Sequence, residues 1–122
     1  MANEVNAGAA DVVDAWFTAW ALADESERER VLATIATETI QYSDRYSVID
    51  GRSELEQHIG GAIRFMPGVR MQRKGAVRHC QGTLLVDWSA VRGDDRQEFA
   101  SGTSVFVLEP GGRIASATGF WN

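Results

Sequence analysis

The second half of the chain constrains the fold most, because from Val69 onward it alternates with the period of β-strands. It holds four strand candidates, which are separated by short turns rich in glycine, aspartate and proline: 69–80, 83–92, 97–109 and 113–121. Consecutive strands joined by such short turns pair antiparallel, because a parallel pair would need a long crossover connection. The sequence therefore predicts an antiparallel meander.

The first half has the period of a helix instead. Val13, Trp16, Phe17 and Trp20 follow the i, i+3, i+4, i+7 spacing that places side chains on one helical face. A first helix is therefore predicted over 9–23, with two tryptophans one turn apart on its apolar side.

Two further helices are predicted from Ser-x-x-Glu capping boxes. The first box runs from Ser26 to Glu29 and the second from Ser53 to Glu56. Between these helices lies a β-branched segment over 38–43, which predicts a short strand followed by a loop.

This order of elements predicts one α+β domain over 1–122, with 1–8 as a flexible N-terminus. Its helices should fold over a strongly curved antiparallel sheet and enclose one apolar pocket. Several strands are apolar on both faces, as at Val105, Phe106, Val107 and Leu108. Helices can cover one face only, so we expect a second copy of the chain to cover the other.

Composition excludes several classes of function. The net charge of −5 disfavours nucleic-acid binding, and the basic stretch over 70–78 is not interleaved with aromatic residues. A single cysteine, Cys80, excludes an internal disulfide and suits a reducing compartment. We read no signal peptide at the N-terminus and no apolar stretch long enough to span a membrane, so a cytoplasmic protein is expected.

Short motifs accompany the order of elements and occur along nearly the whole chain. They are Tyr42-Ser43-Asp44, Asp50-Gly51-Arg52, Pro67-Gly68, Arg78-His79, Val86-Asp87-Trp88, Gly102-Thr103, Gly112-Arg113-Ile114 and Thr118-Gly119-Phe120-Trp121. Together they resemble the nuclear transport factor two-like superfamily, and most closely its SnoaL-like branch of polyketide cyclase and ketosteroid isomerase type.

The resemblance implies a cone-shaped barrel with three helices packed on the sheet around a pocket, and homodimers that pack sheet to sheet. It implies no single activity. Members include ketosteroid isomerases, polyketide cyclases, epoxide hydrolases, dehydratases and proteins without catalysis, so function has to be argued from the site. We expect no cofactor.

Asp44 is the first catalytic candidate, because the resemblance implies a proton-moving carboxylate just after the first strand. An aspartate facing an apolar cavity loses solvation and can act as a base near neutral pH. The alternative is a loop aspartate that caps a turn or pairs with Arg45 or Arg52. Tyr42 and His79 are the candidate hydrogen-bond donors beside it.

The predicted pocket wall is mainly aromatic. Four tryptophans are more than a small core needs, and they favour a flat, apolar ligand. The residues expected to line the pocket are Trp16, Trp20, Phe65, Trp88, Ser104, Phe106 and Trp121.

Known chemistries of the resembled proteins fit this sequence incompletely. Trp16 stands where the isomerases have a tyrosine and Ser104 where they have a protonated acid, so steroid isomerisation is disfavoured. Asp87 lacks the partners of an epoxide hydrolase, and it should pair across strands instead. With two histidines and no metal-binding spacing, no metal site is expected. Three readings stay open: a small cofactor-free lyase or isomerase, a non-catalytic ligand-binding or accessory domain, and, more weakly, a protein–protein adaptor.

Overall fold

The computed structural model describes residues 2–93 and 97–122, with side chains from Gly8 onward. In this part of the chain, the helices and strands follow the predicted order, with one additional short strand. None of the described helices is long and apolar enough to cross a membrane. The elements are α1 (Ala2–Ala19), α2 (Glu25–Ile35), β1 (Ala36–Ser43), β2 (Val48–Asp50), α3 (Arg52–Phe65), β3 (Val69–Cys80), β4 (Thr83–Arg92), β5 (Glu98–Leu108) and β6 (Ile114–Trp121).

The apolar face predicted for the first helix is confirmed. Val13, Trp16 and Phe17 are buried along one side of α1, which packs against β3. The helix extends to Ala2, so the backbone expected to be a flexible N-terminus is helical. It ends at Ala19, where a turn begins.

Neither predicted capping box forms. The N-cap of α2 is Asp24, whose carboxylate accepts a hydrogen bond from the Glu27 backbone N–H at 3.0 Å, so Ser26 already lies in the first turn. The N-cap of α3 is Gly51, at φ +97° and without a side-chain cap. The Glu56 side chain does not cap the helix, because it binds a buried arginine on the neighbouring helix instead.

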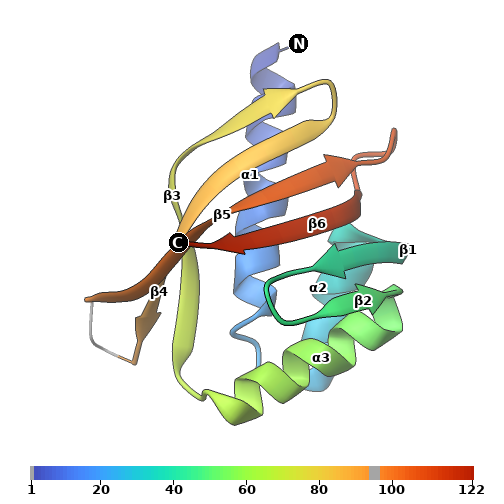
Figure 1. The fold of residues 1–122 in the computed structure, drawn as a ribbon. Helices are drawn as coiled ribbons and strands as arrows, with labels where there is room; N and C mark the ends of the chain where they lie inside the picture. The colour runs from blue at the N-terminus through green and yellow to red at the C-terminus, as the bar shows by residue number, and fades with distance from the viewer. Residues whose placement is uncertain (1, 94–96) are drawn as a thin grey trace.

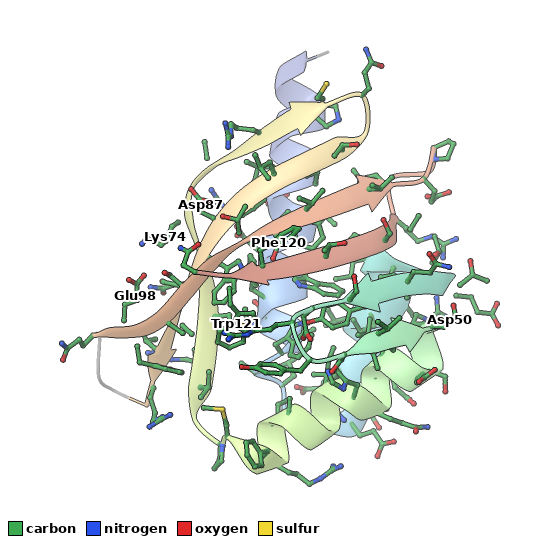
Figure 2. All side chains as sticks on the ribbon, in the orientation of Figure 1. Asp50, Lys74, Asp87, Glu98, Phe120 and Trp121 are labelled. Atoms are coloured by element: carbon green, nitrogen blue, oxygen red, sulfur yellow. The ribbon has the colours of Figure 1, made fainter. Side chains whose placement is uncertain are left out.

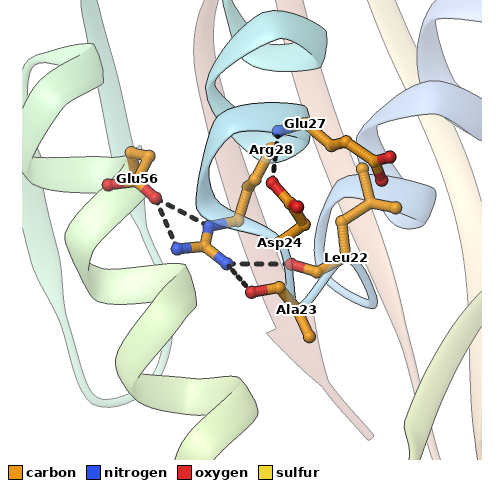
Figure 3. A network of polar contacts seen from close by, with 6 residues as sticks. All are labelled: Leu22, Ala23, Asp24, Glu27, Arg28 and Glu56. Atoms are coloured by element: carbon orange, nitrogen blue, oxygen red, sulfur yellow. Dashed lines mark hydrogen bonds and ion pairs between the residues drawn. The ribbon is translucent and has the colours of Figure 1, made fainter.

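That arginine, Arg28, ties α2 to α3 and to the preceding loop. Its Nε donates to Glu56 Oε1 at 2.8 Å, and its Nη1 donates to the carbonyl oxygens of Leu22 at 2.8 Å and Ala23 at 3.4 Å (Figure 3). Both side chains are buried, so each charge depends on the other for compensation. The contact therefore fixes how the two shorter helices sit together.

The sheet has the strand order β2-β1-β6-β5-β4-β3. The meander from β3 to β6 is antiparallel, as predicted, whereas β1 pairs parallel with β6. The sheet is thus mixed, because α3 and the whole meander separate these two strands in the sequence. β2, within the segment expected to be a loop, pairs antiparallel with β1.

Strong curvature brings this sheet around α1 (Figure 1). The pairing register shifts within β3, near Gly75 at φ +77°, and again within β4 and β5. Such bulges bend a strand and increase its twist. The predicted fold class is confirmed: three helices pack on a strongly curved sheet that stays open.

Candidate functional site

A cavity of about 70 Å³ lies between α1 and the concave side of the sheet. Alternation along the strands places its wall, because the buried side chains of β4, β5 and β6 point toward the helices. Six residues expected from the sequence line it: Trp16, Trp20, Trp88, Ser104, Phe106 and Trp121. The remaining lining residues are Tyr42, Asp44, Met71, Ala117, Thr118 and Gly119.

The aromatic rings of the wall contact one another, edge to face for Trp16 with Phe106 and for Trp88 with Trp121, and tilted for Trp16 with Tyr42. Trp16 lies 5.6 Å from Phe106 and 5.8 Å from Tyr42 between ring centroids, and Trp88 lies 5.3 Å from Trp121. Trp121 is 42 % exposed and stands at the end of β6, beside the loop between β1 and β2 (Figure 2). It is therefore the part of the wall that faces solvent.

Two hydrogen-bond donors of this wall lack an acceptor within the described part of the chain. The ring N–H groups of Trp20 and Trp88 are buried and find no partner among the described residues. Trp88 is only 1 % exposed, so water does not satisfy it from outside. Unpaired buried donors are rare in folded proteins and call for an explanation, such as a missing acceptor.

Asp44 and Tyr42 form the polar corner of the cavity. The Tyr42 hydroxyl donates a hydrogen bond to Asp44 Oδ2, and the backbone N–H groups of Tyr46 and Ser47 each donate to Asp44 Oδ1 at 2.9 Å. The carboxylate thus caps the turn after β1, as one of the two sequence-based alternatives expects. It pairs with neither nearby arginine: Arg52 donates instead to the Ala36 carbonyl oxygen at 3.1 Å.

The pKa of the Tyr42 hydroxyl is raised well above that of an ordinary tyrosine. Burial is the main cause, followed by the hydrogen bond to Asp44 and the negative charge of that carboxylate. Tyr42 therefore remains a neutral phenol at physiological pH and keeps donating to Asp44.

Space remains directly above this corner, at Gly119. A methyl group built on its Cα would lie 3.8 Å from Ser104 Oγ, 3.8 Å from Asp44 Cβ and 4.0 Å from the Tyr42 hydroxyl oxygen. Three polar side chains thus converge on a volume that the glycine leaves open. The sequence holds a signal for this position, because Gly119 and Trp121 share a strand face.

Two predicted site residues lie elsewhere. Phe65 is 85 % exposed, because it occupies the last turn of α3, beyond the reach of the sheet. His79 is exposed at the end of β3, where its Nε2 accepts a hydrogen bond from the Gly82 N–H at 3.1 Å. Neither lines the cavity, so His79 cannot assist Asp44 in this arrangement.

The other histidine lies closer to the site. The ring of His58, on α3, is 6.0 Å from that of Tyr42 and 5.9 Å from that of Trp20. Asp87 lies on the opposite side of the sheet from Trp88 and accepts a hydrogen bond from Thr103 Oγ1 at 2.8 Å (Figure 2). That cross-strand contact leaves Asp87 outside the cavity.

Among the residues that the structure describes, one group of acids meets the geometric requirement for metal ligands, at Glu25, Glu29 and Glu56. Glu56 already serves as the partner of Arg28, and the other two carboxylates are exposed on α2. None of the three residues lines the cavity, and charged side chains on the surface of the pair α2 and α3 account for the cluster.

No protein-family model matches the sequence, and no curated protein matches it. Solved structures do resemble this chain in fold. A candidate isomerase of the SnoaL-like family from Agrobacterium tumefaciens superposes with a TM-score of 0.88 at 22% identity, over 95% of this chain and 98% of that one.

Two other structures show the same architecture with different named activities. A candidate SnoaL-like polyketide cyclase from Jannaschia has a TM-score of 0.77 at 12% identity, over 97% of this chain and 88% of that one. An epoxide hydrolase of LEH-like type from M. tuberculosis has a TM-score of 0.67 at 16% identity, over 96% and 84%. The named activities differ while the architecture is shared. The chain therefore has the NTF2-like α+β cone fold, in the form found in SnoaL-like proteins.

Proposed function

We propose that the cavity binds a small apolar molecule and that Asp44 removes a proton from it, as in a cofactor-free isomerase, cyclase or dehydratase. The observation that carries this proposal is the polar corner itself. The Tyr42 hydroxyl, the Ser104 hydroxyl and the Asp44 side chain lie around Gly119, in a cavity whose wall is mainly aromatic.

The hydrogen bonds to Asp44 define what it can do as a base. A carboxylate has about four lone-pair directions, and three are occupied by Tyr42, Tyr46 and Ser47. One direction is left for a substrate proton, and the other three hold the carboxylate in place, which favours catalysis by orientation. A carboxylate is a weak base, so the substrate C–H should be acidified by a neighbouring carbonyl group.

A carbonyl oxygen of the substrate would also accept hydrogen bonds from the unpaired donors of the wall. The N–H groups of Trp20 and Trp88 are buried without acceptors, and a ligand oxygen is the kind of group that they lack. These two N–H groups would then supply part of the hydrogen bonding to the substrate oxygen that Trp16 and Ser104 do not provide.

The test is hydrogen exchange at carbon, which requires no knowledge of the natural substrate. Acetophenone and 2-tetralone are incubated with the protein in D₂O, and loss of the α-proton signal is followed by ¹H NMR. We expect exchange above the buffer rate with the native chain and a loss of about 100-fold with Asp44→Asn, the lower end of general-base effects.

Asp50→Asn is the matched control, since this aspartate is exposed at the end of β2 (Figure 2). It should leave the exchange rate unchanged. Exchange by Asp44→Asn at the native rate would rule out Asp44 as the base.

Non-catalytic ligand binding is the second candidate function. The geometry of Asp44 favours it in one respect, because a carboxylate that caps a turn and accepts from Tyr42 already has a structural purpose. The same NMR samples decide between the two functions. Ligand-induced shifts of the tryptophan signals without proton exchange for either ketone would support binding alone.

We also propose that a second copy of the chain covers the outer face of the sheet. Val107 is 39% exposed there, next to the half-buried Leu85 and Val105. Apolar patches of this kind are typical of isologous interfaces. Val107→Lys should convert a dimer to a monomer in sedimentation experiments, and a native chain that sediments as a monomer at high concentration would refute the proposal.

A further inference from the structure

The cavity by itself is small for a substrate. Sites for drug-sized ligands commonly enclose about 300–1,000 Å³, whereas this one encloses about 70 Å³. A second hollow of about 300 Å³ lies directly beside it. The linings of the two voids share Asp44, Thr118, Gly119 and Trp121, so the voids adjoin at the end of β6, and a ligand too long for the cavity would extend toward the hollow.

The chemistry of the hollow differs from that of the cavity. Phe120 and Trp121, which are 55% and 42% exposed, contribute aromatic surface to it. Ser43 and Thr118 are paired residues of the parallel strands β1 and β6, so two hydroxyl-bearing residues lie next to each other at its base. The cavity buries apolar surface, while the hollow offers hydrogen-bonding groups beside water.

A cation completes the hollow. Arg45 lines it, and the guanidinium carbon lies 5.5 Å from the centroid of the Tyr46 ring, which in turn lies 6.4 Å from the ring of Trp121. Among the described residues, Arg45 has no carboxylate or other hydrogen-bond partner. By contrast, the side chains of Arg28 and Arg73 bind Glu56 and Asp14.

We propose that the ligand of this site is a small planar carboxylic acid, whose apolar part occupies the aromatic cavity and whose carboxylate lies in the hollow against Arg45. This inference rests on the proposed ligand site and adds the class of ligand. A guanidinium binds carboxylates through two parallel N–H···O bonds, a geometry that a point charge does not reproduce.

The distribution of charge supports placing the carboxylate of the ligand against Arg45. The chain carries a net charge of −5, so it repels anions at long range and a local cation is needed to hold one. Hydrogen bonds from Tyr42 and two backbone N–H groups stabilise the negative charge of Asp44, which repels a second carboxylate. The carboxylate of a ligand is therefore favoured at the solvent side of the hollow, and the acidic C–H near Asp44.

The test compares two molecules of nearly the same shape, cinnamate and its uncharged amide, cinnamamide. The tryptophan indole N–H signals in a ¹H–¹⁵N spectrum report binding in the cavity, and calorimetry gives the affinity. We expect cinnamate to bind about three- to fivefold more tightly at low salt, the size expected for an exposed ion pair. The difference should shrink in 1 M salt, where the Debye length falls to about 3 Å.

Arg45→Gln should remove the preference for cinnamate while both molecules still shift the tryptophan signals. Arg45→Lys should retain only part of it. The matched control is Arg92→Gln, because Arg92 also stacks on a ring, at 4.8 Å from that of Phe99, but lines neither void. It should keep the full preference.

Two results would overturn the inference, and they are distinguishable. If both molecules shift the tryptophan signals with equal affinity, or if Arg45→Gln leaves the preference intact, the ligand class is wrong and the cavity proposal stands. If neither molecule shifts any tryptophan signal, the ligand site fails, and this inference fails with it.

Discussion

The buried ion pair between Arg28 and Glu56 allows a quantitative prediction about stability. Arg28 and Glu56 are 4% and 6% exposed, and the contact between them joins α2 to α3 (Figure 3). Glu56→Gln keeps the size of the side chain and an acceptor oxygen but leaves the guanidinium charge uncompensated. Removing one partner of a buried pair typically costs about 3–5 kcal/mol.

We expect a loss of about 3 kcal/mol in the free energy of unfolding, the lower figure because the amide oxygen can still accept a hydrogen bond. For a chain of 122 residues, an unfolding entropy of about 2.1 cal/mol/K per residue converts this loss to a fall of about 12 °C in Tm. Total stabilities of about 5–15 kcal/mol are usual, so the variant should still fold.

Urea denaturation followed by circular dichroism measures the effect, with Glu54→Gln as the control on the same helix. Glu54 is exposed and has no ion-pair partner among the described residues, so its change should stay within about 0.5 kcal/mol. A double variant, Arg28→Met with Glu56→Leu, should recover much of the loss, because an apolar pair avoids burying an unpaired charge. A Glu56→Gln protein as stable as its control would refute the reasoning.

Three further predictions concern glycines and tyrosines. In α3, Gly60→Ala should destabilise the protein by about 1–2 kcal/mol, because its Cβ would lie 2.7 Å from the buried guanidinium. Gly61→Ala, whose nearest contact is 3.9 Å, should stabilise it by about 0.5–1 kcal/mol. Equal urea midpoints for the two variants would contradict both expectations. In a Tyr46→Phe protein, Tyr42 is the remaining tyrosine, and tyrosinate absorbance should rise only well above pH 10. Since its folded pKa is raised, its stabilising contribution is complete below pH 10 and declines as the pH climbs through that folded value; absorbance rising near pH 10 in the folded protein would show that Tyr42 is not buried as described. Gly119→Ala should keep the fold, because the nearest atoms lie 3.8 Å from the added methyl group, and weaken acetophenone binding severalfold in NMR titrations; unchanged affinity would place the ligand elsewhere.

Much of the fold could be predicted because its signals are local. The bounds of β3 and β4 match the prediction, since alternation and glycine turns lie within those segments themselves. The apolar face of α1 was equally readable from spacing. By contrast, the N-cap of α2 moved to Asp24, because Asp and Ser cap comparably and neighbouring residues alone do not choose between them.

The candidate site was predictable only in part. Aromatic type and strand alternation were enough to place Trp16, Trp88 and Trp121 around one cavity. They failed for Phe65 and His79, because a side chain beyond the covering element is exposed whatever its type. The distance of a residue from the edge of a layer is a property of the packed structure.

By itself, the sequence determined the type and order of the main helices and strands, and which of their faces are apolar. Periodicity carries that information, because a helix and a strand repeat every few residues along the chain. Only the tertiary structure decided that β1 lies parallel to β6, that Glu56 binds Arg28 and leaves its helix uncapped, and that Tyr42, Asp44 and Ser104 converge above Gly119. Each of these depends on contacts between distant segments, whose partners are chosen by packing and charge compensation across the whole domain.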